Sequence, residues 1–200
     1  RSGQPRPRVE RRCGAVRPAQ PEGASNAQFS HSGAGQPWLQ AQVMAAVPLV
    51  EPVASGYRIS RVFEAVERRD PAGWSRGDLV RVRVIVDGTA AMPWVVIADP
   101  LPPGATVLGS GLARDTTIVA APAAAAAQRN ENRPTPTFIE REAAAVHAYF
   151  ERLSPGRQVF EYVMRLNQPG EFRLPPSRVE AMYAPDVFGE APNAVLSVKP

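Results

Sequence analysis

Two segments of the chain alternate between apolar and polar side chains as half-buried strands do. In residues 79–87, LVRVRVIVD, valines at alternate positions share one face, while Arg81 and Arg83 share the other. In residues 159–166, VFEYVMRL, one of the two faces is wholly apolar. A period of two residues predicts a β-strand with one face against a core. We expect the two arginines to be solvated charges rather than an anion site.

Proline and glycine limit the length of any other element. The 200 residues include 22 prolines and 15 glycines, which leaves little room for long helices. A rigid turn is predicted at 99–104, where Gly104 is free to adopt a positive φ. The other predicted strands are short and cover 57–63, 94–98, 116–120, 178–183 and 193–198. Short strands at near-regular spacing predict an all-β, antiparallel, immunoglobulin-like sandwich.

Residues 140–152 leave two interpretations open. Helix propensity favours a helix over EREAAAVHAYFER. However, Val146, Ala148 and Phe150 alternate with more polar neighbours, which favours a strand. As a strand, residues 145–152 would pair with residues 159–166 in a hairpin across the turn SPGR.

Changes in composition divide the chain into three parts. Residues 1–27 contain no aromatic side chain and no period, so we expect a disordered basic tail. Residues 28–56 comprise a predicted strand at 37–47 and a proline-containing linker at 48–56. The predicted sandwich occupies residues 57–200.

The net charge of +4 belongs to the tail alone. Residues 1–27 hold six arginines and two glutamates, so the remaining residues are electrically balanced. A neutral body argues against nucleic-acid binding, which requires a positive field on the folded domain. The single cysteine, Cys13, excludes an intrachain disulfide. No segment has the apolar length of a signal peptide or a membrane span, so we expect no membrane insertion by this chain.

Candidate catalytic and metal-ligating residues are few and scattered. His31 and His147 are isolated and far in sequence from Cys13, so we expect no metal site and no cofactor. Asp99 precedes a proline at a strand end, where an Asx-type turn is the usual role. Ser110 lacks the strand–turn–helix context of a nucleophile elbow. The sequence therefore predicts no catalytic residue and no enzyme.

The segment MYAPDVFG, residues 182–189, combines bulky side chains with turn residues. Pro185 is expected to restrict the backbone of a loop, and Gly189 to permit its reversal. The bulky side chains are those of Met182, Tyr183, Val187 and Phe188. Two interpretations remain open: these side chains pack onto their own sandwich, or they form an exposed apolar knob that covers a neighbouring domain.

Four stretches resemble the end of bacterial α2-macroglobulins. They are SHSGAGQPW (30–38), SGYRISR (55–61), DPLPPGATVLGSGL (99–112) and LPPSRVEAMYAPDVFGE (174–190). Segments 77–87 and 153–172 also look similar, and the resemblance covers roughly residues 28–198. It implies a macroglobulin-like β-sandwich at the carboxyl end of a much longer protease trap. It also favours strand over helix for residues 145–152.

The resemblance implies a function that depends on other parts of such a trap. In these proteins a bait segment is cut, the molecule rearranges, and an internal thioester bonds the protease. A thioester needs a Cys-x-x-Gln arrangement, which Cys13, followed by Gly14, Ala15 and Val16, does not provide. We therefore expect the chain to be a fragment that lacks the thioester. Its expected partners are the other domains, above all the thioester domain, and target proteases through the full-length protein.

The resemblance also assigns a role to the apolar segment. It implies that Met182, Tyr183, Val187 and Phe188 shield the thioester, in a protein of the periplasm or cell envelope. The alternative is a generic immunoglobulin-like adhesion or recognition module of the cell envelope. Sandwich folds support both functions, so the fold alone does not separate them.

Overall fold

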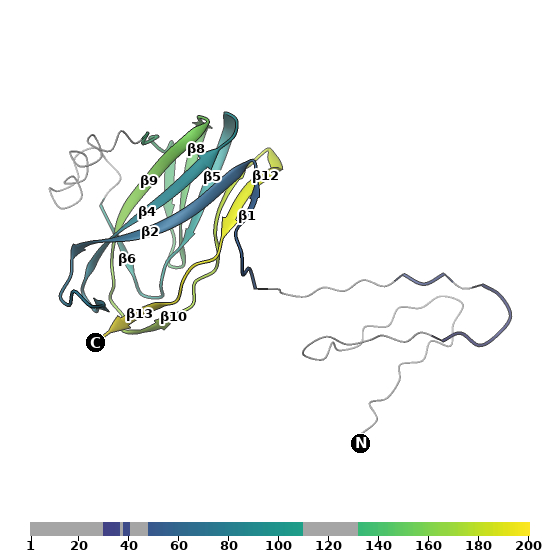
Figure 1. The fold of residues 1–200 in the computed structure, drawn as a ribbon, viewed down its shortest axis with the longest axis horizontal. Helices are drawn as coiled ribbons and strands as arrows, with labels where there is room; N and C mark the ends of the chain where they lie inside the picture. Colours follow the sequence, from purple (N-terminus) through teal and green to yellow (C-terminus); the bar gives the residue numbers. More distant parts are fainter. Residues whose placement is uncertain (1–29, 37, 41–47, 110–131) are drawn as a thin grey trace, which may run out of the picture. The chain divides into compact units, whose positions relative to one another are not determined.

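The computed structural model describes residues 30–36, 38–40, 48–109 and 132–200 (Figure 1). An amino-terminal unit ends at Ala46 and is separate from the unit that holds the strands. Its described residues, 30–36 and 38–40, are exposed and form neither helix nor strand. Three expectations lie outside the described residues: the tail at 1–27, most of the strand at 37–47, and the strand at 116–120.

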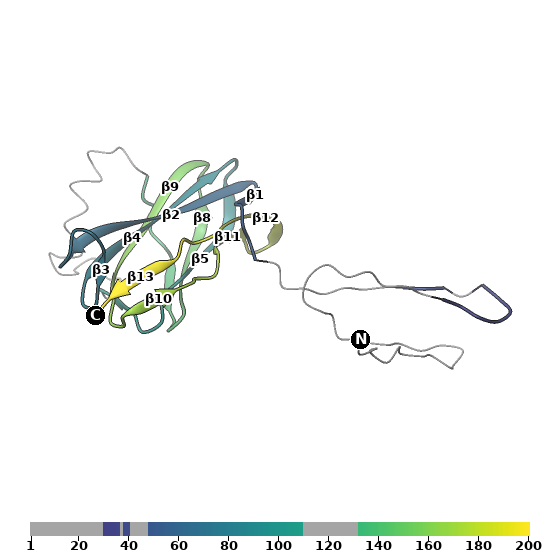
Figure 2. The same ribbon diagram turned by 60° about the horizontal axis from the view of Figure 1, so that its bottom comes forward.

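The carboxy-terminal unit is an antiparallel β-sandwich, which confirms the predicted fold class (Figures 1 and 2). The larger sheet has six strands in the order β1 (Val53–Ser55), β12 (Ala184–Ala191), β11 (Ser177–Ala181), β5 (Met92–Pro100), β8 (Ala145–Leu153) and β7 (Phe138–Arg141). The second has four, in the order β2 (Tyr57–Glu67), β4 (Leu79–Gly88), β9 (Gly156–Arg165) and β6 (Thr106–Leu108).

A small third sheet lies at the end of the sandwich that carries the carboxyl terminus (Figure 1). Its strands follow the order β10 (Gly170–Phe172), β13 (Leu196–Lys199) and β3 (Trp74–Ser75). The pairing of β13 with β3 is parallel, whereas every other strand pair in the described residues is antiparallel.

The core lies between the inner faces of the two larger sheets, as the alternation predicted. The four alternate valines of β4 are fully buried. The apolar face of β9 opposes the larger sheet, and Phe160 meets Phe150 of β8 edge to face with ring centroids 6.1 Å apart. Edge-to-face packing suits the aromatic quadrupole, so this pair stabilises the contact between the sheets.

Strands β8 and β9 do not form the hairpin that the sequence predicted. Residues 145–153 are a strand, which confirms the interpretation favoured by the resemblance, but β8 pairs with β5 and β7. Strand β9 pairs instead with β4 and β6. The chain passes from one sheet to the other between Leu153 and Gly156. Each strand turns an apolar face toward the same core, so the two meet through side chains and not through the backbone.

The predicted linker at 48–56 ends inside the sandwich. Strand β1 lies within it and pairs with β12. Gly56, with φ of +85°, then redirects the chain into β2. The predicted turn at 99–104 begins at the end of β5, and Gly104 adopts the expected positive φ of +76°.

Candidate functional site

The candidate site is the turn between β11 and β12. Met182 and Tyr183 form this turn, where Ala181 of β11 pairs with Ala184 of β12. Tyr183 is 78% exposed and Met182 is 44% exposed. The expectation of a loop over 184–189 is wrong, because these residues belong to β12. The two bulky side chains therefore project from a hairpin rather than from a loop.

A third exposed large apolar residue, Trp94, is joined to the turn through its backbone. The N–H of Met182 donates a hydrogen bond to the carbonyl oxygen of Trp94, at 2.8 Å. Trp94 is 43% exposed, and its φ of +48° falls in the left-handed region that bulky residues seldom adopt. The sequence missed this residue because it begins the apolar run WVVIA, which predicts a buried central strand.

The other two bulky side chains of segment 182–189 contact their own domain. Val187 is half-buried and packs against the core, and Phe188 lies under the Arg178 guanidinium with 4.7 Å to the ring centroid. The expected role of Gly189 is wrong: it lies within β12 and reverses nothing. A Cβ there would lie 2.6 Å from the carbonyl oxygen of Tyr57, so Gly189 permits close contact of the backbones.

A buried polar network lies inside the sandwich and centres on Asp99. The expected Asx-type turn is wrong, because this carboxylate is fully buried and accepts hydrogen bonds from the hydroxyls of Tyr162 and Ser177, both at 2.5 Å. The Arg61 Nε lies 3.2 Å from Oδ2 of Asp99, and Arg61 Nη2 donates to the Pro100 carbonyl at 2.9 Å. All four side chains come from stretches that carry the family resemblance.

The network joins the two larger sheets. Asp99 and Ser177 belong to the six-stranded sheet, while Arg61 and Tyr162 belong to the four-stranded one. Burial raises the pKa of Asp99, although the charge of Arg61 and the two hydroxyl donors act in the opposite direction. Burial, with the nearby Asp99, also holds the pKa of Tyr162 well above its usual value. Closed to solvent, the network is a structural tie and not a catalytic site.

The arginines of β4 are not all solvated, which corrects our expectation. Arg83 is buried and forms ion pairs with Glu161 at 2.7 Å and Glu64 at 3.0 Å. Glu161 also binds Arg133, with N–O distances of 2.7 and 2.8 Å. The N–H of Val159 in β9 donates to the Asn132 carbonyl, so the segment at 132–133 covers this outer face.

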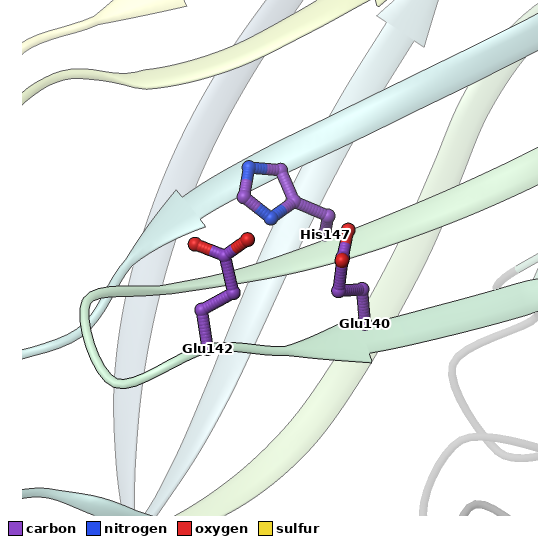
Figure 3. Close-up of side chains that lie close together, drawn as sticks. All are labelled: Glu140, Glu142 and His147. Carbon is purple, nitrogen blue, oxygen red and sulfur yellow. The ribbon is translucent and has the colours of Figure 1, made fainter.

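The remaining catalytic candidates stay apart, with one exception. His31 is exposed, and Cys13 and Ser110 lie outside the described residues. His147 lies close to Glu140 and Glu142, and Figure 3 shows the three side chains gathered at the β7–β8 turn. The sequence reasoning missed this group because it considered only histidine and cysteine as ligands. Within the described ranges, no helix is both long enough and apolar enough to cross a bilayer.

Comparison with known proteins agrees with this fold. The family model of the bacterial alpha-2-macroglobulin MG10 domain matches residues 56–186. A search of curated proteins gave no match. Similar solved structures include trypsin-activated alpha-2-macroglobulin from Escherichia coli, with a TM-score of 0.60 and 21% identity over 75% of this chain. Salmonella alpha-2-macroglobulin reacted with methylamine has a TM-score of 0.57 and 22% identity, also over 75% of this chain.

The chain spans a small part of these relatives. It covers 11% of the E. coli protein and 10% of the Salmonella protein. It covers 25% of a native E. coli structure that runs from domain MG7 to the C-terminus, with a TM-score of 0.59 and 21% identity over 76% of this chain. These identities show a shared fold alone. The family match, however, covers well over half of the chain, so the chain belongs to the bacterial alpha-2-macroglobulin family as an MG10 domain, and it is not an enzyme.

Proposed function

We propose that this MG10 domain shields the thioester domain of a bacterial protease trap. The complete polypeptide would inhibit endopeptidases, and this domain would pack against the thioester domain until the bait segment is cut. We place the protein in the periplasm or cell envelope. The solved relatives support this proposal, since the E. coli protein is described as activated by trypsin and the Salmonella protein as reacted with methylamine.

The exposure of Tyr183 is the observation that carries the proposal. A phenol ring that is 78% exposed contributes little to its own domain. Met182 is next to it in the turn, and Trp94 is joined to Met182 by a backbone hydrogen bond, so three exposed large apolar residues form a group here. Such a group is typical of a surface that packs against another domain.

The turn has the physical properties that a shield requires. A thioester survives only where water is excluded, because hydrolysis competes with capture of the protease. Tyr183 and Met182 provide the bulk, and the hydrogen bond from Met182 to Trp94 holds the turn in place. Val187 anchors β12 to the core, and Phe188 lies beneath Arg178, so both support the turn from behind.

Removing the Tyr183 side chain in the complete polypeptide tests the shield. Tyr183→Ala and Tyr183→Gly should increase the rate of methylamine incorporation severalfold before any protease is added, because water and amine reach the thioester. The melting temperature should hardly change. Phe138→Ala is the matched control, since Phe138 is 60% exposed but lies on the distant edge strand β7. An unchanged incorporation rate in both Tyr183 variants would reject the shield.

A further inference from the structure

The β7–β8 hairpin brings together three side chains that can bind a metal ion. Glu140 of β7 lies directly opposite His147 of β8 in the strand register, so both side chains point to the same face. Glu142 begins the turn, which closes by a hydrogen bond from its N–H to the Ala145 carbonyl at 2.9 Å. One ligand atom from each of the three side chains lies within 4.8 Å of the other two.

One nitrogen of the His147 imidazole lacks a hydrogen-bond partner. Its Nδ1 atom is buried and makes no hydrogen bond. Figure 3 shows the ring directed toward the two carboxylates, with Glu140 on the opposite strand and Glu142 at the start of the turn. A buried nitrogen without a partner costs free energy, and a bound cation would satisfy its lone pair.

We propose that His147, Glu140 and Glu142 bind a zinc ion at the outer edge of the six-stranded sheet. One imidazole nitrogen and two carboxylate oxygens form a donor set that zinc accepts. The two carboxylates also balance the charge of the ion. Three protein ligands leave a fourth coordination position for water or for a ligand from outside the chain.

The surrounding contacts suit this assignment. The Tyr149 hydroxyl donates a hydrogen bond to Oε2 of Glu140 at 3.0 Å, which fixes that carboxylate and leaves its other oxygen for the ion. Zinc bonds of about 2.1 Å require the three ligand atoms to move together by about 1 Å. The side chain of Glu142 is exposed and can make that movement.

Zinc binding to the whole, untagged chain tests the proposal. Equilibrium dialysis should give one zinc ion per chain. Cobalt bound in place of zinc should give the visible absorption spectrum that is typical of a low coordination number. His147→Ala and Glu142→Gln should each weaken binding at least about tenfold, because each removes a ligand. Tyr149→Phe, which removes the hydrogen bond to Glu140, should weaken binding about tenfold.

Matched variants separate this site from other donors in the chain. His31→Ala, Cys13→Ser and Glu171→Gln should leave the affinity unchanged, since they remove an imidazole, a thiol and a surface carboxylate elsewhere. Glu142 is exposed, so its variant tests the site even if His147→Ala were to unfold. The absence of stoichiometric binding would overturn the proposal. So would zinc binding that persists in Glu142→Gln, or that is lost in His31→Ala or Cys13→Ser.

Discussion

The Asp99 network and the β11–β12 turn reverse the usual distribution of side chains. Asp99 and Arg61 bring opposite charges into the core, whereas Tyr183 and Met182 carry large apolar surface outside it. Buried charge is costly unless it is paired, and Arg61 is the counter-charge of Asp99, so the network must serve the fold. The exposed turn contributes little to the fold, and we propose that it contacts another domain. The comparison separates residues that stabilise the fold from residues that we propose contact another domain.

The largest effect is expected from Asp99→Ala. The variant leaves the buried Arg61 without its counter-charge and deprives Tyr162 and Ser177 of their acceptor. The free energy of unfolding should fall by about 3–5 kcal/mol, as measured by urea denaturation. Asp99→Asn keeps the shape of the side chain, and its free energy of unfolding should lie between those of wild type and Asp99→Ala. A loss below about 1 kcal/mol would show that the network is not a structural tie.

A smaller effect is expected from Tyr162→Phe, which removes one hydrogen bond to the carboxylate. The expected loss is about 1.5–3 kcal/mol, because the acceptor is charged. Tyr57→Phe is the matched control, since the Tyr57 hydroxyl is buried and makes no hydrogen bond. The control should leave stability at neutral pH unchanged or slightly raised. Equal losses in the two variants would contradict the role assigned to the Asp99 network.

Alkaline pH should reveal the Tyr57 hydroxyl itself. Burial raises the pKa of Tyr57 from 10.0 to about 12. The folded protein therefore keeps this proton where the unfolded chain loses it, so the contribution is complete below pH 10 and is lost as the pH rises toward about 12. The slope should reach about 1.4 kcal/mol per pH unit. Unfolding of wild type and Tyr57→Phe should diverge across this window, and parallel curves would contradict the buried assignment.

The smallest effect on stability is expected from Tyr183→Ala in this chain. Because the side chain is exposed, the free energy of unfolding should change by less than about 0.5 kcal/mol. Thermal and urea unfolding provide the measurement, with Val195→Ala as a second exposed site. A loss comparable to that of Tyr162→Phe would show that Tyr183 packs onto its own sandwich, and the contrast between network and turn would disappear.

Alternation in the sequence was sufficient to predict the sandwich and much of its core. The valines of β4 and the apolar face of β9 lie where a period of two places them. Alternation shows which face is buried, however, and not which strand lies alongside. This is why the predicted β8–β9 hairpin was wrong. Pro185 and Gly189 are typical turn residues, so they wrongly suggested a loop. The sequence could not show the actual reason for Gly189, which is the close approach of Tyr57 from a strand distant in sequence.

The sites were harder to predict than the fold. Asp99 carries no local sign of burial, since Arg61, Tyr162 and Ser177 are 38, 63 and 78 residues away in the chain. Glu140 and His147 meet only because their strands pair, and the residues alone left helix and strand open there. Bulk within a turn-rich segment drew attention to Tyr183, but the residues alone left open whether its side chain packs onto the sandwich or is exposed, as the structure has it. Trp94 was missed because nothing local to it indicated a left-handed backbone.

The passage of the chain between sheets at Leu153–Gly156 has a consequence for how the domain is made. Strand β8 can pair locally with β7, but its other partner, β5, is distant in sequence. Strand β9 cannot pair with its neighbour β8 and must wait for β4, where Leu79 lies opposite Arg165. Closing such long loops costs chain entropy before any contact repays it, so folding should be slow and collective. Val198 and Lys199 of β13 join Trp74 and Ser75 of β3. During synthesis, β3 therefore cannot pair until β13, more than a hundred residues later, has left the ribosome.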